Sequence, residues 1–164
     1  MDVARKDEID ALAAKLKAVP IDVVINNAGV YSRAPNSQDF GQFDYSLFDT
    51  IMAVNVRGPL MVMEAFAGNV KASHQKKFVA ISSTVGSLTQ PFPGTAALFY
   101  RTSKAAVSLI QFNLQRLLPA SCMPPIACER IKAPYPAAFG LSLPLDRLVL
   151  IWRLRAATRA KPPL

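Results

Sequence analysis

Tyr100 and Lys104 are the side chains whose types and spacing most clearly suggest chemistry. They lie four residues apart, and on a helix that spacing places both on one face. A free tyrosine loses its proton near pH 10, so it is a poor acid or base at neutral pH. A fixed cation beside it favours the phenolate and lowers that pKa. The pair alone is more often two surface residues, so further residues must support a proton-transfer role.

A serine hydroxyl that binds a carbonyl oxygen would complete a minimal site for ketone reduction. Ser83 offers one, because it follows the apolar segment Phe78–Ile81 and precedes Gly86. Ser87 is the other candidate for this role. It lies 13 residues before Tyr100, whereas Ser83 lies 17 residues before it. We favour Ser83 because it closes a predicted strand. No side chain donates a hydride, so a nicotinamide is the natural source.

Alternating helices and strands must position these groups. The periodicity of apolar residues predicts helices over residues 7–17, 45–70 and 100–118, and strands over residues 21–25 and 78–81. Asp7 is expected to cap the first helix, and Gly58-Pro59 to bend or interrupt the second. This order predicts βαβ units and a parallel sheet covered on both faces.

Polar residues follow both predicted strands. Asn26–Gly29 comes after the first strand and Ser82-Ser83 after the second. In open α/β sheets the ligand site lies beyond the carboxyl ends of the strands. The sequence therefore predicts that these residues gather at one edge of the sheet.

Four motifs together resemble the short-chain dehydrogenase/reductase family. In chain order they are Asn26-Asn27-Ala28-Gly29, Asn55-Val56-Arg57-Gly58, Ser83-Thr84-Val85-Gly86 and Tyr100-Arg101-Thr102-Ser103-Lys104. Within the family, the sequence is most similar to carbonyl reductases of the sniffer and C-factor type. The resemblance covers residues 1 to about 118. It implies a partial Rossmann-type doubly wound parallel sheet, without the first two strands, and flanking helices.

The resemblance implies an NADP- or NAD-dependent oxidoreductase that reduces a small-molecule carbonyl or oxidises an alcohol. Tyr100 would be the general acid in reduction and the base in oxidation. Lys104 would lower the pKa of Tyr100 and bind the nicotinamide ribose. Ser83 would orient the carbonyl. Asn55 would hold a water in the proton relay, or its side chain would satisfy the backbone at Gly58-Pro59; the two roles are compatible.

Further cofactor contacts are implied near the N-terminus and after the first predicted strand. Asp2 and Val3 resemble a family segment that touches the adenine ring. Asn27, Ala28 and Gly29 would border the cofactor, while Asn26 would brace the sheet.

The sequence departs from the family at its N-terminal end. The family opens with a strand and a TGxxxGxG turn, whose glycines let the pyrophosphate approach a helix. Residues 1–28 contain no glycine. We therefore expect a fragment of a longer reductase, with weak dinucleotide binding, exposed sheet edges and low stability. The alternative is a non-catalytic family remnant that associates through the helices over residues 45–70 and 100–118, as homo-oligomers of the family do.

Residues 119–164 form a divergent, basic and proline-rich segment. Eight of the 13 prolines lie in the last fifty residues. Residues 115–164 hold eight Lys or Arg against two Asp or Glu, so they carry most of the net charge of +8. We expect little regular structure there, apart from one possible helix over residues 143–157. Because the charge gathers in this segment rather than on a folded face, it does not favour nucleic-acid binding.

Composition excludes several other classes. The sequence contains no run of about 18 uncharged apolar residues, so we expect no membrane span. The N-terminus is charged and no apolar segment follows it, so we do not expect a signal peptide. We expect a cytoplasmic protein. Cys122, Cys128 and the single His74 do not supply the four ligands that a zinc site needs, so no metal is expected.

Overall fold

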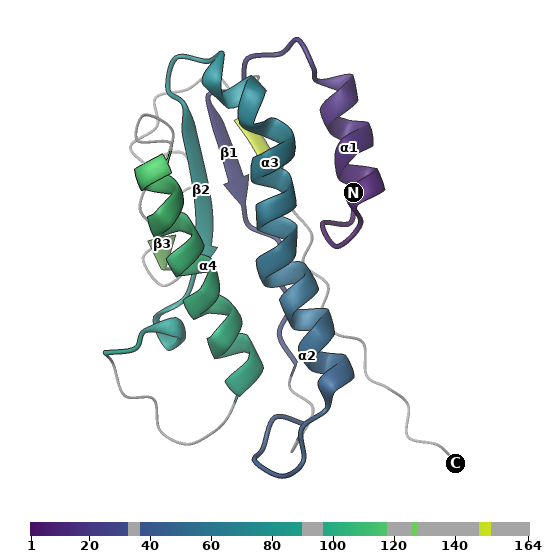
Figure 1. Cartoon of the computed structure of the whole chain (residues 1–164), viewed down its shortest axis with the longest axis vertical. Coiled ribbons are helices and arrows are strands. Elements are labelled where there is room, and N and C mark those ends of the chain that lie inside the picture. The colour runs from purple at the N-terminus through teal and green to yellow at the C-terminus, as the bar shows by residue number, and fades with distance from the viewer. Residues whose placement is uncertain (33–36, 90–96, 118–125, 128–147, 152–164) are drawn as a thin grey trace.

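A four-stranded parallel sheet organises the chain (Figure 1). The computed structural model describes residues 1–32, 37–89, 97–117, 126–127 and 148–151. The strands are β1 (Val23–Asn26), β2 (Lys77–Ser82), β3 (Ile126–Ala127) and β4 (Leu148–Ile151), in the order β3-β2-β1-β4. All three neighbouring pairs are parallel. β1 and β2 are the predicted strands, and their nearly continuous burial is typical of a sheet covered on both faces.

In the described part of the chain, four α-helices accompany the sheet. They are α1 (Lys6–Lys15), α2 (Tyr45–Met52), α3 (Gly58–Lys71) and α4 (Leu98–Leu117). Figure 1 shows α2 and α3 as one long rod in front of β1, with α4 beside it in front of β2 and α1 along the outer side of α3. The predicted order of helices and strands through residue 117 is therefore confirmed.

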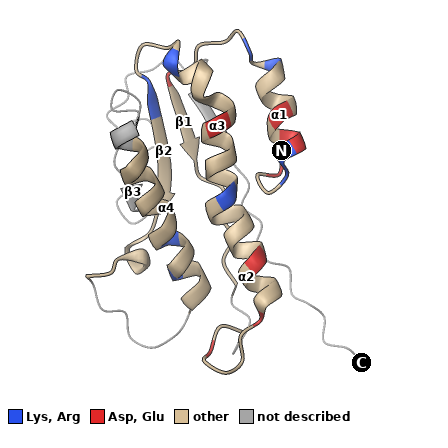
Figure 2. Cartoon of the chain, in the orientation of Figure 1, with Lys and Arg blue, Asp and Glu red and all other residues tan. Residues whose placement is uncertain are grey.

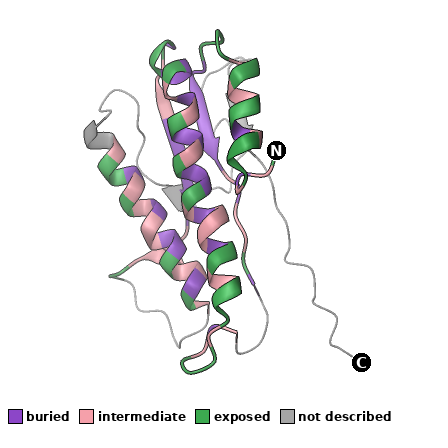
Figure 3. Cartoon of the chain, turned by 45° about the vertical axis from the view of Figure 1, so that its right-hand side comes forward, coloured by how far each residue is buried: buried purple, intermediate pink, exposed green. Residues whose placement is uncertain are grey.

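The core lies between the helices and one face of the sheet, where purple buried residues line the inner sides of α3 and α4 (Figure 3). Val24 and Phe78 come from the sheet, Phe66 and Val70 from α3, and Val107 from α4, and each is at most 2% exposed. These apolar contacts fix the two long helices relative to the carboxyl ends of β1 and β2.

A short π-helix, η1 (Ala53–Arg57), joins α2 to α3. Pro59 has no N–H, so it cannot donate the α-helical hydrogen bond to the carbonyl of Asn55, four residues earlier. The predicted interruption near Gly58-Pro59 is thus present, but it is a π turn rather than the end of a helix. Gly58 has a second role, because a Cβ there would lie 2.9 Å from the carbonyl oxygen of Val3.

One local expectation is wrong. Arg5, not Asp7, precedes the first helical residue, and Asp7 lies in the first turn of α1. The carboxylate of Asp7 is ion-paired with Arg5 instead of capping the helix. Asp44 provides a side-chain cap for α2, accepting from the backbone N–H groups of Ser46 and Leu47.

The segment beyond residue 117 also differs from expectation. The prediction of a helix over residues 143–157 is wrong for Leu148–Ile151, because these residues form the strand β4. The other residues of that range lie outside the described residues. β4 pairs with β1 and β3 pairs with β2. β1 thus has a strand on each side, and the exposed sheet edges that we expected do not include it. The expected boundary at residues 118–119 also falls outside the described ranges.

Charge is dispersed over the described part of the chain, where Lys and Arg are scattered along the helices and at the start of β2 (Figure 2). No helix in that part is long and apolar enough to span a membrane.

Candidate active site

The site is built where α4 passes the carboxyl end of β2. Lys104 is only 6% exposed, and its Nζ donates a hydrogen bond of 2.8 Å to the carbonyl oxygen of Ile81. The same nitrogen lies 5.5 Å from the centroid of the Tyr100 ring. The structure thus brings together the two side chains that the sequence singled out, with the ammonium held by the sheet and the phenol half-buried.

Asn55 is held by three hydrogen bonds of its side chain. It is 2% exposed. Its Oδ1 accepts from the N–H of Val30 at 2.8 Å, and its Nδ2 donates to the carbonyl oxygen of Val30 at 3.0 Å. Nδ2 also donates to Ser103 Oγ at 3.0 Å. The Asn55 amide therefore joins α4 to the segment that follows β1. The alternative expectation was that it would satisfy the backbone at Gly58-Pro59, and it does not.

The segment after β1 lies against the same groups. A Cβ added to Gly29 would lie 3.5 Å from Asn55 Oδ1 and 3.6 Å from Lys104 Nζ. Two residues later, the Tyr31 ring meets the Tyr100 ring edge to face, with centroids 5.1 Å apart. Glycine at position 29 therefore leaves open the space beside the ammonium.

Ser83 directly follows β2 and is the N-cap of the short 3-10 helix η2 (Thr84–Gly86). Its half-buried Oγ accepts from the N–H of Val85 at 3.4 Å. Ser87 Oγ instead shares a hydrogen bond of 3.1 Å with Thr89 Oγ1.

η2 is fixed by close contact with α4. A Cβ on Gly86 would lie 2.9 Å from the backbone of Lys104 and Ala105, and Arg101 Nε donates to the carbonyl oxygen of Val85 at 3.2 Å. Because Ser83 caps η2, these contacts set the position of that hydroxyl relative to α4.

The remaining predicted cofactor residues lie in two places. Asn27 and Ala28 follow β1, and Ala28 is 7% exposed and packs into the core. Val3 is buried against Gly58, while Asp2 Oδ1 accepts from the N–H of Ala4 at 3.1 Å.

Ser103 is the site residue that the sequence reasoning missed. Its hydroxyl donates to the carbonyl oxygen of Tyr100 at 2.7 Å while it accepts from Asn55. A signal existed: Ser103 lies one turn before Val107, which belongs to the apolar face of the predicted helix. A small polar residue at that spacing faces the core and needs a hydrogen-bond partner.

The residues present fit the nicotinamide-ribose end of a dinucleotide. Gly29 leaves the space beside Lys104 Nζ that a side chain would otherwise fill. A pyrophosphate is usually admitted by a glycine-rich turn that precedes a helix. No such turn precedes α1 or α2, which follow Arg5 and Asp44, respectively. Among the residues that the structure describes, no cluster of three or more His, Cys, Asp or Glu could hold a metal ion.

Several known proteins are similar to this chain. C-signal of Myxococcus xanthus is 32% identical over 99 residues, which are 60% of this chain and 57% of that protein. Gluconate 5-dehydrogenase of Gluconobacter oxydans is 36% identical over 108 residues, 65% of this chain and 39% of that protein. The chain thus spans little more than half of one curated relative and less than half of the other.

Solved structures show the same fold. A gluconate 5-dehydrogenase from Burkholderia cenocepacia in complex with NADP and tartrate has a TM-score of 0.63 at 25% identity, covering 77% of this chain and 48% of that one. The NADPH-bound carbonyl reductase from chicken fatty liver has a TM-score of 0.68 at 22% identity, covering 92% and 62%, and supports the fold alone. The model of the short chain dehydrogenase family matches residues 1–121, most of the sequence. The chain belongs to the short-chain dehydrogenase/reductase family.

Proposed function

We propose that this chain carries the proton-transfer side of an NAD(P)-dependent oxidoreductase site that reduces a carbonyl or oxidises an alcohol. One observation carries the proposal: Lys104 Nζ is held by Ile81 and lies 5.5 Å from the centroid of the Tyr100 ring. A buried cation at that distance favours the phenolate that remains after Tyr100 gives up its proton. The family supports the reaction class, because relatives include gluconate 5-dehydrogenase.

Each side chain then has a defined task. In reduction, Tyr100 donates its phenolic proton to the substrate oxygen, and in oxidation the phenolate takes that proton back. Lys104 stabilises the phenolate. Ser83 donates a hydrogen bond that orients the carbonyl. Both N–H groups of the Asn55 side-chain amide are donated within the protein. Pro59 has no N–H to donate to the backbone carbonyl of Asn55. This carbonyl is therefore a better group than the side-chain amide to bind a relay water.

The nicotinamide, when bound, supplies or accepts the hydride. Lys104 would hold its ribose, with Asn27, Ala28 and Gly29 along its border and Asp2 and Val3 toward the adenine. NADP is bound in the similar structure of gluconate 5-dehydrogenase from Burkholderia cenocepacia, which makes NADPH the first cofactor to test and NADH the second.

The test combines binding and turnover. NADPH, NADH and reduced nicotinamide mononucleotide are titrated by fluorescence, and reduction of a panel of carbonyl compounds is followed. Y100F should lower the rate about 10²- to 10⁴-fold, the usual contribution of a general acid, and leave cofactor binding unchanged. Y45F is the matched control, because Tyr45 is 68% exposed on α2, and it should retain full activity. No binding of any of the three at about 1 mM, the upper end of common KM values, would refute the proposal.

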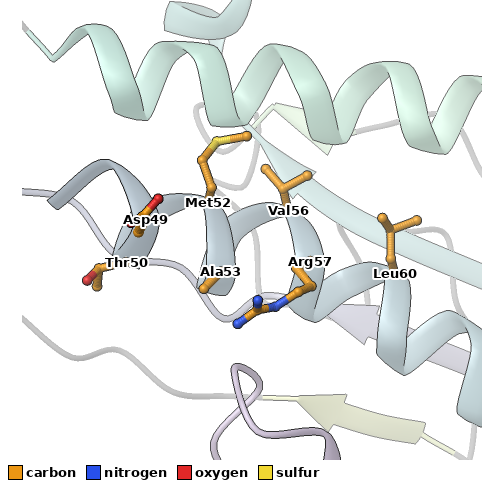
Figure 4. A pocket seen from close by; sticks show the side chains of 7 residues that line it. All are labelled: Asp49, Thr50, Met52, Ala53, Val56, Arg57 and Leu60. Atoms are coloured by element: carbon orange, nitrogen blue, oxygen red, sulfur yellow. The ribbon is translucent and has the colours of Figure 1, made fainter. Parts of the chain in front are cut away.

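A second function, subunit association, is favoured by the outer face of α2 and α3. An open pocket of about 630 Å³ lies there, called here the α2–α3 groove. Its lining residues are Asp49, Thr50, Met52, Ala53, Val56, Arg57 and Leu60. Figure 4 shows Met52, Val56 and Leu60 pointing to the same side of the rod. Leu60 is 42% exposed, and on α4 Leu109 is 61% and Phe112 54% exposed.

The charges of this groove suit a second copy of the chain. Asp49 and Arg57 are two turns apart and lie toward opposite ends of the groove. When two such rods pack antiparallel about a two-fold axis, each Asp49 meets the Arg57 of the other copy. We propose that D49R and R57D each weaken the dimer and that the double variant restores it, as sedimentation velocity would show. Monomers at all concentrations, or no restoration in the double variant, would contradict this pairing.

A further inference from the structure

A partly buried run of hydrogen bonds joins three segments of the site. We call Val30, Asn55 and Ser103 the Asn55 clamp. Val30 lies after β1, Asn55 in η1 and Ser103 in α4. Asn55 forms two hydrogen bonds with the backbone of Val30 and one with Ser103 Oγ. Segments distant in the sequence are therefore held together by one amide group.

Ser103 and the backbone of Val30 together determine which way that amide points. It is fully buried, and its only proton is donated to the carbonyl oxygen of Tyr100 at 2.7 Å. A hydroxyl whose proton is engaged can only accept further hydrogen bonds. Ser103 therefore requires a donor from Asn55, which places Nδ2 toward α4 and leaves Oδ1 for the N–H of Val30.

The direction of the amide matters because the Asn55 amide and Lys104 border the same space beside Gly29. Asn55 Oδ1 and Lys104 Nζ lie within 3.5 and 3.6 Å, respectively, of the same point beside Gly29. A reversed amide would place its NH2 group against the N–H of Val30, so two donors would face each other. Next to Val30, the Tyr31 ring contacts the Tyr100 ring.

We propose that Ser103 is a positioning residue: by fixing the direction of the Asn55 amide, it holds the segment Gly29–Tyr31 against Tyr100 and Lys104. Its meaning for catalysis rests on the proposed function, whereas its effect on the clamp does not.

The experiment compares S103A, S103T and S108A. Ser108 is the matched control, because it also lies on α4 and its hydroxyl also donates to a backbone carbonyl, that of Lys104 at 2.9 Å. Two NMR measurements report on the clamp: hydrogen exchange of the Val30 amide, and the nuclear Overhauser contact between the Tyr31 and Tyr100 rings. S103A should accelerate exchange at Val30 about tenfold, as expected for one buried hydrogen bond, and weaken the ring contact.

The remaining variants and the kinetics complete the test. S103T, which keeps the hydroxyl, should restore both NMR signals, and S108A should leave them unchanged. With a carbonyl substrate, S103A should lower kcat with little change in KM. Normal Val30 exchange in S103A, an equal effect of S108A, or a normal kcat despite a lost clamp would each overturn the proposal. If the unmodified chain reduces no carbonyl, the proposed function fails, and Val30 exchange still decides whether Ser103 holds the clamp.

Discussion

The four side chains proposed for catalysis differ in how firmly the fold holds them. Lys104 and Asn55 are 6% and 2% exposed and bonded to backbone groups of other elements. Tyr100 and Ser83 are only half-buried. This division suits their proposed tasks, because the buried pair sets electrostatics and geometry while the accessible hydroxyls meet the substrate.

The two candidate serines can be separated by substitution. S83A should lower kcat/KM about 10²- to 10³-fold, the typical loss when a donor to a reacting carbonyl is removed. S87A should stay within about twofold of the unmodified chain, as surface substitutions usually do. Steady-state kinetics of both variants in parallel checks this. The reverse pattern would assign the role to Ser87, whose position 13 residues before Tyr100 was the competing argument.

Sequence reasoning identified Asn55 but not what its side chain does. Its bonds to Val30 span 25 residues and its bond to Ser103 spans 48. Helical periodicity places a residue on a face of its own helix, and it contains no information on which distant loop passes that face. Tyr100 and Lys104 were predictable as a pair because the contact between them is local.

At the scale of elements, η2 depends on a glycine that packs against α4. In G86A the added Cβ would meet the backbone of Lys104 and Ala105 at 2.9 Å. Backbone cannot move aside as a flexible side chain can, so we expect a loss of about 1–3 kcal/mol in the free energy of unfolding. G68A is the matched control: nothing lies within 4 Å of its Cβ in α3, and it should stabilise by about 0.5–1 kcal/mol. Urea unfolding of both variants tests the contrast, and similar losses would refute the packing argument.

Asp44 makes the start of α2 sensitive to pH. Its side chain accepts from the hydroxyl and N–H of Ser46 and from the N–H of Leu47. The hydrogen bond from the Ser46 hydroxyl, followed by the backbone ones, holds the pKa of Asp44 below its ordinary value. The folded pKa is therefore below the unfolded pKa. The stabilisation is fully present above the unfolded value, near 4, and is lost as the pH falls through the folded one.

D44S tests this because serine caps a helix without a titrating charge. As the pH falls below about 4, the unmodified chain should lose more unfolding free energy than D44S does. Urea unfolding at neutral and acidic pH measures it. A difference that stays constant across this range would show that the charge of Asp44 does not stabilise α2.

At the scale of the whole molecule, the sequence predicted the alternation of helices and strands through residue 117 because long periodic segments carry a strong local signal. It did not predict β4. The four apolar residues Leu148–Ile151 fit a buried strand or part of a helix equally well. Whether such a segment becomes a strand depends on the strand with which it pairs. For β4 that partner is β1, which lies far away in the sequence. For the same reason, the expectation of exposed sheet edges could not say that β1 would be covered.

The last prediction concerns what β4 does for the site. β4 pairs with β1 along its whole length, from Val23 with Leu148 to Asn26 with Ile151, and β1 leads directly into the segment that carries Gly29 and Val30. A chain shortened to end at Arg147 loses this strand and exposes the β1 edge, so it should melt at lower temperature and aggregate more readily. A chain that ends at Ile151 keeps the pairing and is the control. The shorter chain should also show faster hydrogen exchange at Val24 and Val30, because losing the pairing loosens β1 and the Asn55 clamp beyond it. Equal melting and equal exchange in the two shortened chains would mean that β4 does not support the sheet.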